Sequence, residues 1–204
     1  MGNMKICADV SLIREPMQQE QFFLQVKDGQ FEIHAGDELG FIYGIYEISR
    51  TFLGVPDFWF WMDSQPDKRM DVRIPDTYFY QAQPCAVCYR GGVINDEVLL
   101  HAWSVDRLKD GPWEMAFETL LRCGGNTVIP GTDRNAGKYR KLASEMGLYI
   151  AHHHAEPLGA EMFARAYPEL KASYAEYPEK FHKLWEDAFA AQEGMKVVLN
   201  LGFP

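Results

Sequence analysis

Strand-like and helix-like segments alternate along the second half of this chain, and the alternation limits its fold more than any other feature. Short apolar runs predict strands, and amphipathic runs that end at glycine predict helices. The expected strands are 86–95, 126–130, 148–152 and 195–201, with helices around Trp113–Leu121, Tyr139–Met146 and Phe181–Phe189 between them. Such repetition implies a parallel sheet with right-handed crossovers. We therefore expect an α/β fold.

The length of this region indicates how much of a known architecture it can hold. A complete (β/α)8 barrel takes about 250 residues, whereas residues 83–204 number 122, which is 204 less 82. The segments fit the first four strands of a (β/α)8 TIM-type barrel, truncated after the fourth. Because half a barrel exposes two sheet edges, we expect the isolated chain to have little or no activity, and either to self-associate as a homo-oligomer or to be loosely packed.

Residues 1–82 predict a separate, small α+β domain. Segments 22–26 and 31–35 resemble strands, and Asp28-Gly29 between them favours a tight hairpin. Apolar residues then recur at helical spacing from Ile42 to Leu53, and Gly54 is a typical helix stop. Several prolines follow, and we place the domain boundary near residue 82. The aromatic run 55–62 predicts a buried strand or a plug at the domain interface, with a sugar-stacking platform as the alternative.

Charge and composition exclude some classes of partner. The formal net charge is −9 and the pI is about 5.1, which weighs against nucleic acid or an anionic membrane as a partner. No secretory leader or membrane-spanning run is evident, so we expect a cytoplasmic location. Cys85 and Cys88 form a lone C-x-x-C pair, which is a weak signal for zinc or redox chemistry.

Polar side chains gather where the predicted strands end. Asn95, Asp96 and Glu97 follow the first strand, and Asn135 lies in the polar stretch after the second. The third strand runs into His152, His153, His154 and Glu156, and the fourth carries Asn200. Active groups of α/β folds lie at this carboxyl-terminal edge. The concentration on one rim favours an enzyme.

Several of these residues have a structural interpretation beside the functional one. The histidines could hold a metal, hydrogen-bond a sugar, or simply be buried. Asp96 and Glu97 could complement a helix dipole, and Asn135 could belong to a helix cap. If Arg90 lies on a strand with Gly92 and Asp96, the three share a face and suit a polar ligand. The alternative for Arg90 is a pair with a buried carboxylate.

Six segments together resemble glycoside hydrolase family 115. They are Tyr89–Glu97, Asn126–Pro130, Met146–Gly147 and His154–Pro157, with Gly40–Tyr46 and Val55–Trp61 upstream, where the chain resembles the small domain that precedes hexosaminidase barrels. The resemblance implies an inverting α-glucuronidase that removes (4-O-methyl)glucuronic acid from glucuronoxylan or its oligosaccharides. It implies no metal and no other cofactor.

The resemblance also implies site residues. Asp96 and Glu156 would be the catalytic carboxylates, with one of them orienting water and a general acid supplied beyond Pro204. Arg90, Asn95, Glu97, Asn135, His153 and His154 would bind the sugar. Two departures from the family pattern are Ala155, where a second histidine is frequent, and 131–133, where an aromatic residue is frequent. The alternatives are a non-catalytic carbohydrate-binding remnant and a metal-dependent hydrolase that uses the histidines.

Overall fold

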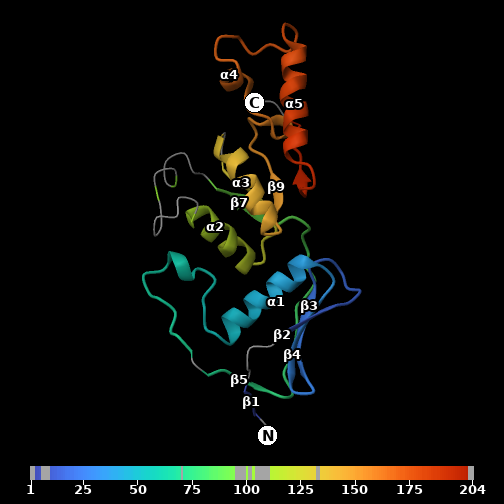
Figure 1. The fold of residues 1–204 in the computed structure, drawn as a ribbon, viewed down its shortest axis with the longest axis vertical. Helices are drawn as coiled ribbons and strands as arrows, with labels where there is room; N and C mark the ends of the chain where they lie inside the picture. Colours follow the sequence, from blue (N-terminus) through green and yellow to red (C-terminus); the bar gives the residue numbers. More distant parts are fainter. Residues whose placement is uncertain are drawn as a thin grey trace. The chain divides into compact units, whose positions relative to one another are not determined.

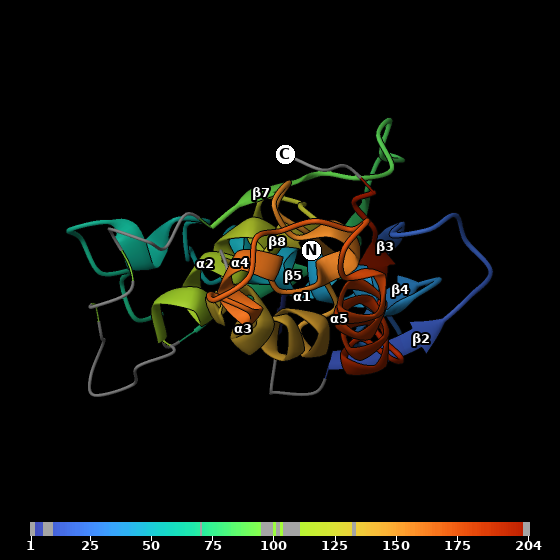
Figure 2. The same cartoon turned by 90° about the horizontal axis from the view of Figure 1, so that it is seen from above.

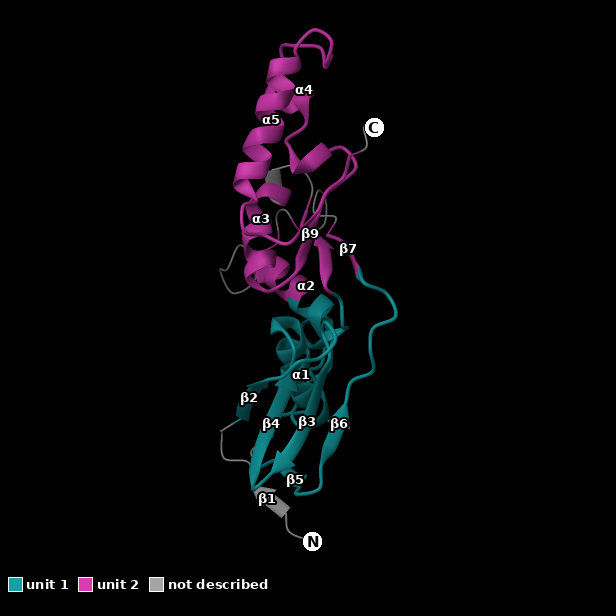
Figure 3. Cartoon of the chain, turned by 90° about the vertical axis from the view of Figure 1, so that its right-hand side faces the viewer, with its two compact units in different colours: residues 1–90, 118–125 teal, residues 91–117, 126–204 magenta. Residues whose placement is uncertain are grey.

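The computed structural model describes residues 3–5, 10–69, 71–94, 100, 103, 111–131 and 134–201, without the side chains of 3–5, 134 and 135. The chain divides into two compact units (Figure 3). Unit 1 comprises residues 1–90 and 118–125, and unit 2 comprises 91–117 and 126–204. The domain boundary predicted near residue 82 stays a prediction. Among the described residues, no helix combines the length and apolar character needed to cross a lipid bilayer.

Unit 1 is built on a four-stranded mixed sheet. Its strands are β2 (Val10–Arg14), β4 (Gln30–Ala35), β3 (Phe22–Lys27) and β6 (Phe79–Gln81), in that spatial order. β2 pairs in parallel with β4, whereas β3 is antiparallel to β4 and to β6. The predicted hairpin is confirmed, since Lys27 pairs with Gln30 and the two residues between them have φ of 50° and 79°. A second, two-stranded sheet joins β1 (Asn3–Lys5) to β5 (Arg73–Pro75).

Helix α1 (Glu38–Thr51) packs on this sheet (Figure 1). Asp37 caps it, because its carboxylate accepts from the backbone N–H of Gly40 at 2.8 Å. The predicted stop is also confirmed, as Gly54 has φ +71°. Leu24, Ile33 and Leu39 are almost fully buried and form the core between sheet and helix.

The aromatic run 55–62 does not form the expected strand. Trp59–Trp61 is a short 3₁₀ helix, η1, in which no residue is buried. Each indole N–H instead finds a polar partner, Trp59 with Glu118 at 3.0 Å and Trp61 with the Thr119 hydroxyl at 2.8 Å. Pro56 begins a turn whose carbonyl accepts from the backbone N–H of Trp59, and this turn replaces the extended backbone that a strand needs. The strand prediction was therefore wrong.

Unit 2 is a parallel α/β sheet. Its strands are β7 (Gly91–Val93), β8 (Thr127–Ile129), β9 (Tyr149–Ala151) and β10 (Val197–Val198), adjacent in chain order and all parallel. The intervening helices are α2 (Gly111–Arg122), whose residues from 118 onward are counted in unit 1, α3 (Arg134–Glu145), η2 (Pro157–Gly159), α4 (Phe163–Ala166) and α5 (Pro178–Ala191). The predicted parallel sheet is confirmed. The sheet is open, and no barrel closes within the described residues.

The first strand of unit 2 is shorter than predicted. It begins at Gly91, whereas the sequence favoured 86–95. The guanidinium of Arg90 donates to the carbonyl of Val87 at 2.7 Å, so the backbone before Gly91 bends and is not paired in the ladder. Arg90 therefore does not lie on the same strand as Gly92.

Helices cover one face of the parallel sheet. Figure 2 shows α3 and α5 on the same side of it. Alternation in a strand sends successive side chains to opposite faces, and Val128 and Ile150 are fully buried on the helix side. Gly91, Gly92 and Val93 are exposed. Glycines with positive φ follow the helices, at Gly124, Gly147 and Gly194, as the sequence predicts.

Gly91 and Gly92 offer a matched test of this packing. A Cβ added at Gly91 would overlap the backbone carbonyl of Thr127 on β8, whereas one added at Gly92 meets no atom within 4 Å. We expect Gly91→Ala to lower the free energy of unfolding by about 2 kcal/mol or more, because the strands must separate. Gly92→Ala should change it by less than about 1 kcal/mol. Urea unfolding followed by circular dichroism checks both, and equal effects would contradict the packing of β7 on β8.

Candidate functional site

The residues after β9 begin the candidate site, and they differ in how far each is buried. Ile150 and His152 face the helices and are buried, with 0% and 6% exposure. His153 is half-buried and His154 is exposed. The strand therefore separates a structural histidine from two histidines that solvent or a ligand can reach.

The backbone carbonyl of His153 fixes the shape of this rim. It accepts from the backbone N–H of Glu156 at 2.9 Å and from the side-chain amide of Asn200 at 3.1 Å. Asn200 follows β10, and its own carbonyl accepts from the backbone N–H of Leu158 at 2.8 Å. The loops after two neighbouring strands are thus tied together. Leu158 has φ 57°, a left-handed conformation held by these bonds.

His153 and His154 form the accessible part of the rim. Their ring centroids are 4.1 Å apart and the ring planes make an angle of 45°. The backbone N–H of Ala155 donates to Nδ1 of His153 at 3.4 Å. Because Nδ1 takes part in this bond, Nε2 is the ring nitrogen that can face a hydroxyl or carboxylate oxygen of a ligand. This chemistry suits a polar ligand.

Beneath the rim lies a buried polar network. Arg140 on α3 donates to the carbonyl of Gly159 at 2.7 Å, and it interacts electrostatically with Glu156. Gln192 donates to the carbonyls of Leu158 at 3.2 Å and Ala188 at 2.8 Å. Burial lowers the pKa of Arg140, and the charge of Glu156 partly opposes that change. The network holds the loop 156–160 against α3 and α5.

His152 is neutral at ordinary pH because of this environment. Burial lowers its pKa to about 4, and the nearby charge of Arg140 acts in the same direction. A Cβ on Gly159 would lie 2.7 Å from Cε1 of the imidazole, so the glycine is needed for the loop to close over the ring. His152 is a packing residue in the structure.

Glu156, predicted as a catalytic carboxylate, lies inside this network. It is only 3% exposed. With Arg140 and Gly159 it lines a cavity of about 300 Å³ between α3 and α5, together with Gly137, Ala160, Glu161, Leu184, Asp187 and Ala188. The buried carboxylate thus lies close enough to the buried guanidinium of Arg140 to interact with it electrostatically. The catalytic role of Glu156 stays a prediction.

Four other predicted residues are not placed by the structure. Asn95, Asp96 and Glu97 lie outside the described residues. Asn135 lies in α3, but its side chain is outside the described part of the chain. Their roles stay predictions.

Arg90, predicted to bind the sugar, has protein partners in unit 1. Its guanidinium pairs with Glu20, whose side chain is 3% exposed, and its Nε donates to the carbonyl of Gly124 at 2.8 Å. Burial alone would lower the pKa of Arg90, but the bond to Glu20 raises it above its ordinary value. This is the buried pairing that the sequence left open as the alternative. A sugar contact of Arg90 stays a prediction.

The remaining histidine alternative was a metal centre. Within the ranges that the structure describes, no three His, Cys, Asp or Glu side chains come together as a metal site. His152 is buried while His153 and His154 can reach solvent, so the three consecutive imidazoles do not converge on one point. In the described part of the rim, the accessible His153 and His154 can form hydrogen bonds with a polar ligand.

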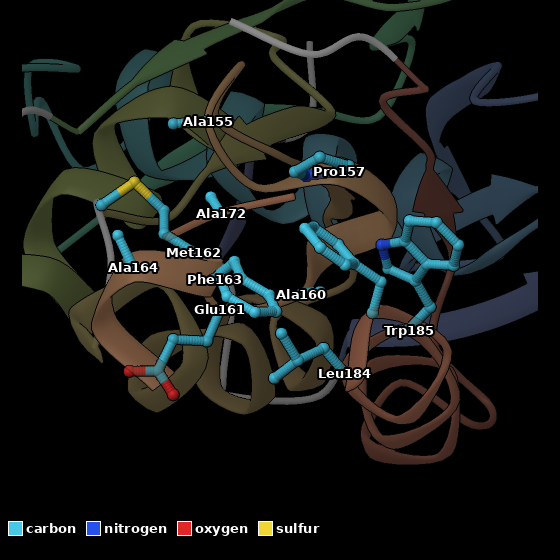
Figure 4. Close-up of a pocket in the computed structure, with 11 residues that line it drawn as sticks. Ala155, Pro157, Ala160, Glu161, Met162, Phe163, Ala164, Ala172, Leu184 and Trp185 are labelled. Carbon is cyan, nitrogen blue, oxygen red and sulfur yellow. The ribbon is translucent and has the colours of Figure 1, made fainter. Parts of the chain in front are cut away.

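An apolar pocket of about 220 Å³ adjoins the rim (Figure 4). It is lined by Ala155, Pro157, Ala160, Glu161, Met162, Phe163, Ala164, Ala172, Phe181, Leu184 and Trp185. The long connection 156–178 supplies most of one side, and α5 supplies Phe181 and Trp185. Phe163 stacks on Phe181 with centroids 4.3 Å apart. In Figure 4 the carboxylate of Glu161 points away from these rings, so the pocket is apolar in character.

Sequence reasoning missed three groups, two beneath the rim and one that pairs with Arg90. Arg140 occupies the buried face of α3 between Ala136 and Ala143, and this helical spacing could have identified it. Gln192 lies just after α5 and is also buried. No local pattern in the sequence could identify Glu20 as the partner of Arg90, because the two residues are 70 positions apart.

The Arg90–Glu20 pair can be tested without any substrate. Arg90→Met would leave the Glu20 carboxylate buried without its guanidinium, and we expect the free energy of unfolding to fall by about 3 kcal/mol. The exposed pair of Arg14 and Glu38 is the matched control, and Arg14→Met should cost less than about 1 kcal/mol. Urea unfolding measures both. Equal, small losses would show that the buried pair is not structural.

His152 predicts a pH dependence of stability. Its pKa is about 4 in the folded chain against 6.5 ordinarily, so between these values the unfolded chain binds more protons. The stabilisation is complete above pH 6.5 and is lost as the pH falls toward 4, by roughly 1.4 kcal/mol per pH unit. His152→Leu should remove this part of the slope, whereas the exposed control His154→Gln should keep it. Urea unfolding at several pH values decides, and an unchanged slope in His152→Leu would refute the burial argument.

Comparisons with known proteins identify the family of this chain and proteins of similar fold. The model of glycosyl hydrolase family 115 matches residues 82–204. A solved family GH115 4-O-methyl-α-glucuronidase, with specificity for decorated arabinogalactans, is 27% identical with a TM-score of 0.77. The alignment covers 91% of this chain and 27% of that protein, so this chain spans little more than a quarter of its relative's length.

A more distant likeness concerns the fold alone. A family 20 β-N-acetylglucosaminidase has a TM-score of 0.51 at 10% identity, over 96% of this chain and 42% of that one. A search of curated proteins finds no match. Since the family model covers more than half of the chain, including every strand of the parallel sheet and the rim after β9, the chain belongs to glycosyl hydrolase family 115.

Proposed function

We propose that this chain is the amino-terminal part of a glycosidase that removes (4-O-methyl)glucuronic acid side chains from a decorated glycan. The family match over residues 82–204 carries the proposal. The solved 4-O-methyl-α-glucuronidase supports the uronic acid as the leaving sugar. The accessible His153 and His154 supply hydrogen-bonding groups at the strand ends, where α/β enzymes bind substrates.

We propose glucuronoxylan or its oligosaccharides as the substrate. The solved relative has specificity for decorated arabinogalactans, so the same uronic acid on a galactan is the competing glycan. The two differ in the neutral main chain and share the side-chain sugar. Assaying both therefore separates recognition of the main chain from recognition of the uronic acid.

We propose that β7 to β10 are the first four strands of a (β/α)8 barrel that is completed by residues outside this chain. Their chain order equals their spatial order and every pair is parallel. Helices cover one face, and on the opposite face, which alternation assigns to Gly91, that residue carries no side chain. A sugar can approach the backbone closely over such a face.

The proposed chemistry is inverting hydrolysis by two carboxyl groups. One protonates the glycosidic oxygen, and the other activates a water on the opposite face of the sugar, with about 6.5–9.5 Å between them. We assign Asp96 as the group that activates water. Glu156 acts with Arg140 as a positioning group for the rim histidines, which its burial favours.

The test uses the complete protein that carries this chain, with glucuronoxylan oligosaccharides and decorated arabinogalactan as substrates. Released uronic acid is quantified, and proton NMR of the first product gives its anomeric configuration. Asp96→Asn should lower kcat by about 10²-fold or more, since it removes the base. The exposed control His182→Gln on α5 should retain full activity.

Two outcomes would count against this function. Near-normal release of uronic acid by Asp96→Asn would remove the residue from the catalytic pair. Binding of either glycan by the unmodified protein with no hydrolysis would instead identify a carbohydrate-binding remnant.

A further inference from the structure

Unit 1 contains a pocket of about 420 Å³ that the proposed catalytic site does not use. Every residue that lines it belongs to unit 1, drawn teal in Figure 3. The lining residues are Glu20, Phe22, Tyr43, Tyr46, Glu47, Arg50, Asp57, Tyr80, Ala82, Gln83, Cys85, Leu121, Arg122, Cys123 and Gly124. Its size is within the range of small-ligand sites.

The charged side chains in this pocket are already paired, either with one another or with neighbouring side chains. Arg50 donates to both carboxylate oxygens of Asp57, at 3.1 and 2.9 Å, and also pairs with Glu47. Arg122 donates to Glu118 at 2.7 Å and to the Ser49 hydroxyl at 3.2 Å. These pairs hold the side chains in fixed positions before any ligand arrives, which reduces the entropy cost of binding.

The net charge of the side chains around this pocket weighs against an anionic ligand. Glu20, Glu47 and Asp57 line it together with Arg50 and Arg122. With the ion-pair partners Arg90 and Glu118 included, four carboxylates face three guanidinium groups. A uronate or phosphate would meet a surplus of negative charge and no uncompensated cation in this pocket. A neutral ligand meets no such barrier.

Two tyrosines supply neutral hydrogen-bonding groups. Burial raises the pKa of both Tyr46 and Tyr80, so each hydroxyl keeps its proton and can both donate and accept. Within the described residues neither hydroxyl makes a hydrogen bond. The contacts of these two residues are made by their rings: Cζ of Arg122 lies 4.6 Å from the ring centroid of Tyr46, and the ring centroids of Tyr80 and Phe22 are 5.9 Å apart. These hydroxyls are therefore available to a ligand.

The pocket also offers apolar surface beside these polar groups. Phe22 and Leu121 are almost fully buried in its wall, and Gln83 adds an amide that both donates and accepts. A sugar ring presents the complementary pattern, with hydroxyls at its edge and C–H groups on its faces. Aromatic and apolar walls with a few fixed polar groups are typical of small-molecule sites.

We propose that this pocket binds a neutral saccharide unit, separately from the rim after β9. The binding itself follows from the pocket, while the identity of the ligand as the undecorated main chain of the substrate rests on the proposed function. Such a site would hold the neutral glycan chain on unit 1, whereas the uronic acid side chain is recognised elsewhere.

The test uses the 204-residue chain with unsubstituted xylotetraose, β-1,3-galactobiose and free glucuronic acid as probes. Saturation-transfer NMR detects contact, and calorimetry gives Kd. We expect at least one neutral oligosaccharide to bind and glucuronic acid not to bind. Tyr46→Phe and Tyr80→Phe should each weaken the neutral ligand by about threefold to tenfold, the loss of one hydrogen bond.

Tyr78→Phe is the matched control. Tyr78 is also half-buried in unit 1 with its pKa raised by burial, but it does not line the pocket, so its substitution should leave Kd unchanged. The thermal midpoint of each variant shows whether the fold is intact. The proposal is overturned if neither neutral oligosaccharide binds, if glucuronic acid alone binds, or if both pocket variants bind as the unmodified chain does.

These outcomes are independent of hydrolysis, because no turnover is measured. If no neutral saccharide binds but the complete protein still releases uronic acid, the proposed binding pocket is refuted and the glycosidase function stands. If a neutral saccharide binds but the complete protein releases no uronic acid, the binding pocket stands and the glycosidase function is refuted.

Discussion

Burial of one face of the parallel sheet is the constraint on which the rest of unit 2 depends. Once α3 and α5 cover that face, the period of two along β9 sends Ile150 and His152 inward and leaves His153 on the accessible side. The loop after the strand must then return against the same helices. Its carboxylate, Glu156, is consequently buried near Arg140, while His153 and His154 remain accessible and form the rim.

Local signals in the sequence predicted the framework well. Asp28-Gly29 can adopt the positive φ values that a two-residue hairpin requires, and glycines after α1, α2 and α3 end those helices as expected. The parallel arrangement of β7 to β10 followed from strand and helix periodicity. These features depend on neighbouring residues, so one stretch of sequence is enough to specify them.

Contacts between residues far apart in the sequence, and the directions in which side chains point, could not be predicted in the same way. The run 55–62 has strand-like composition, yet its tryptophans take partners near residue 118 that no local pattern reveals. Arg90 could be assigned a buried carboxylate but not Glu20 in particular. The motif that contains Glu156 indicated a rim position, whereas the direction of its side chain depends on how the loop closes over His152.

The tight β3–β4 hairpin has a consequence for the order in which unit 1 assembles. Its strands are joined by two residues, so the entropy lost in closing that loop is small, and hairpins of this kind form in about 1–10 μs. The partner on the other edge of β3 is β6, which follows in the sequence only after α1 and β5. The hairpin can therefore exist as a nucleus while β6 is still unpaired. During synthesis on the ribosome, the outer edge of β3 would remain open until residue 81 has emerged, and this is the interval in which unit 1 is most exposed to wrong strand pairing.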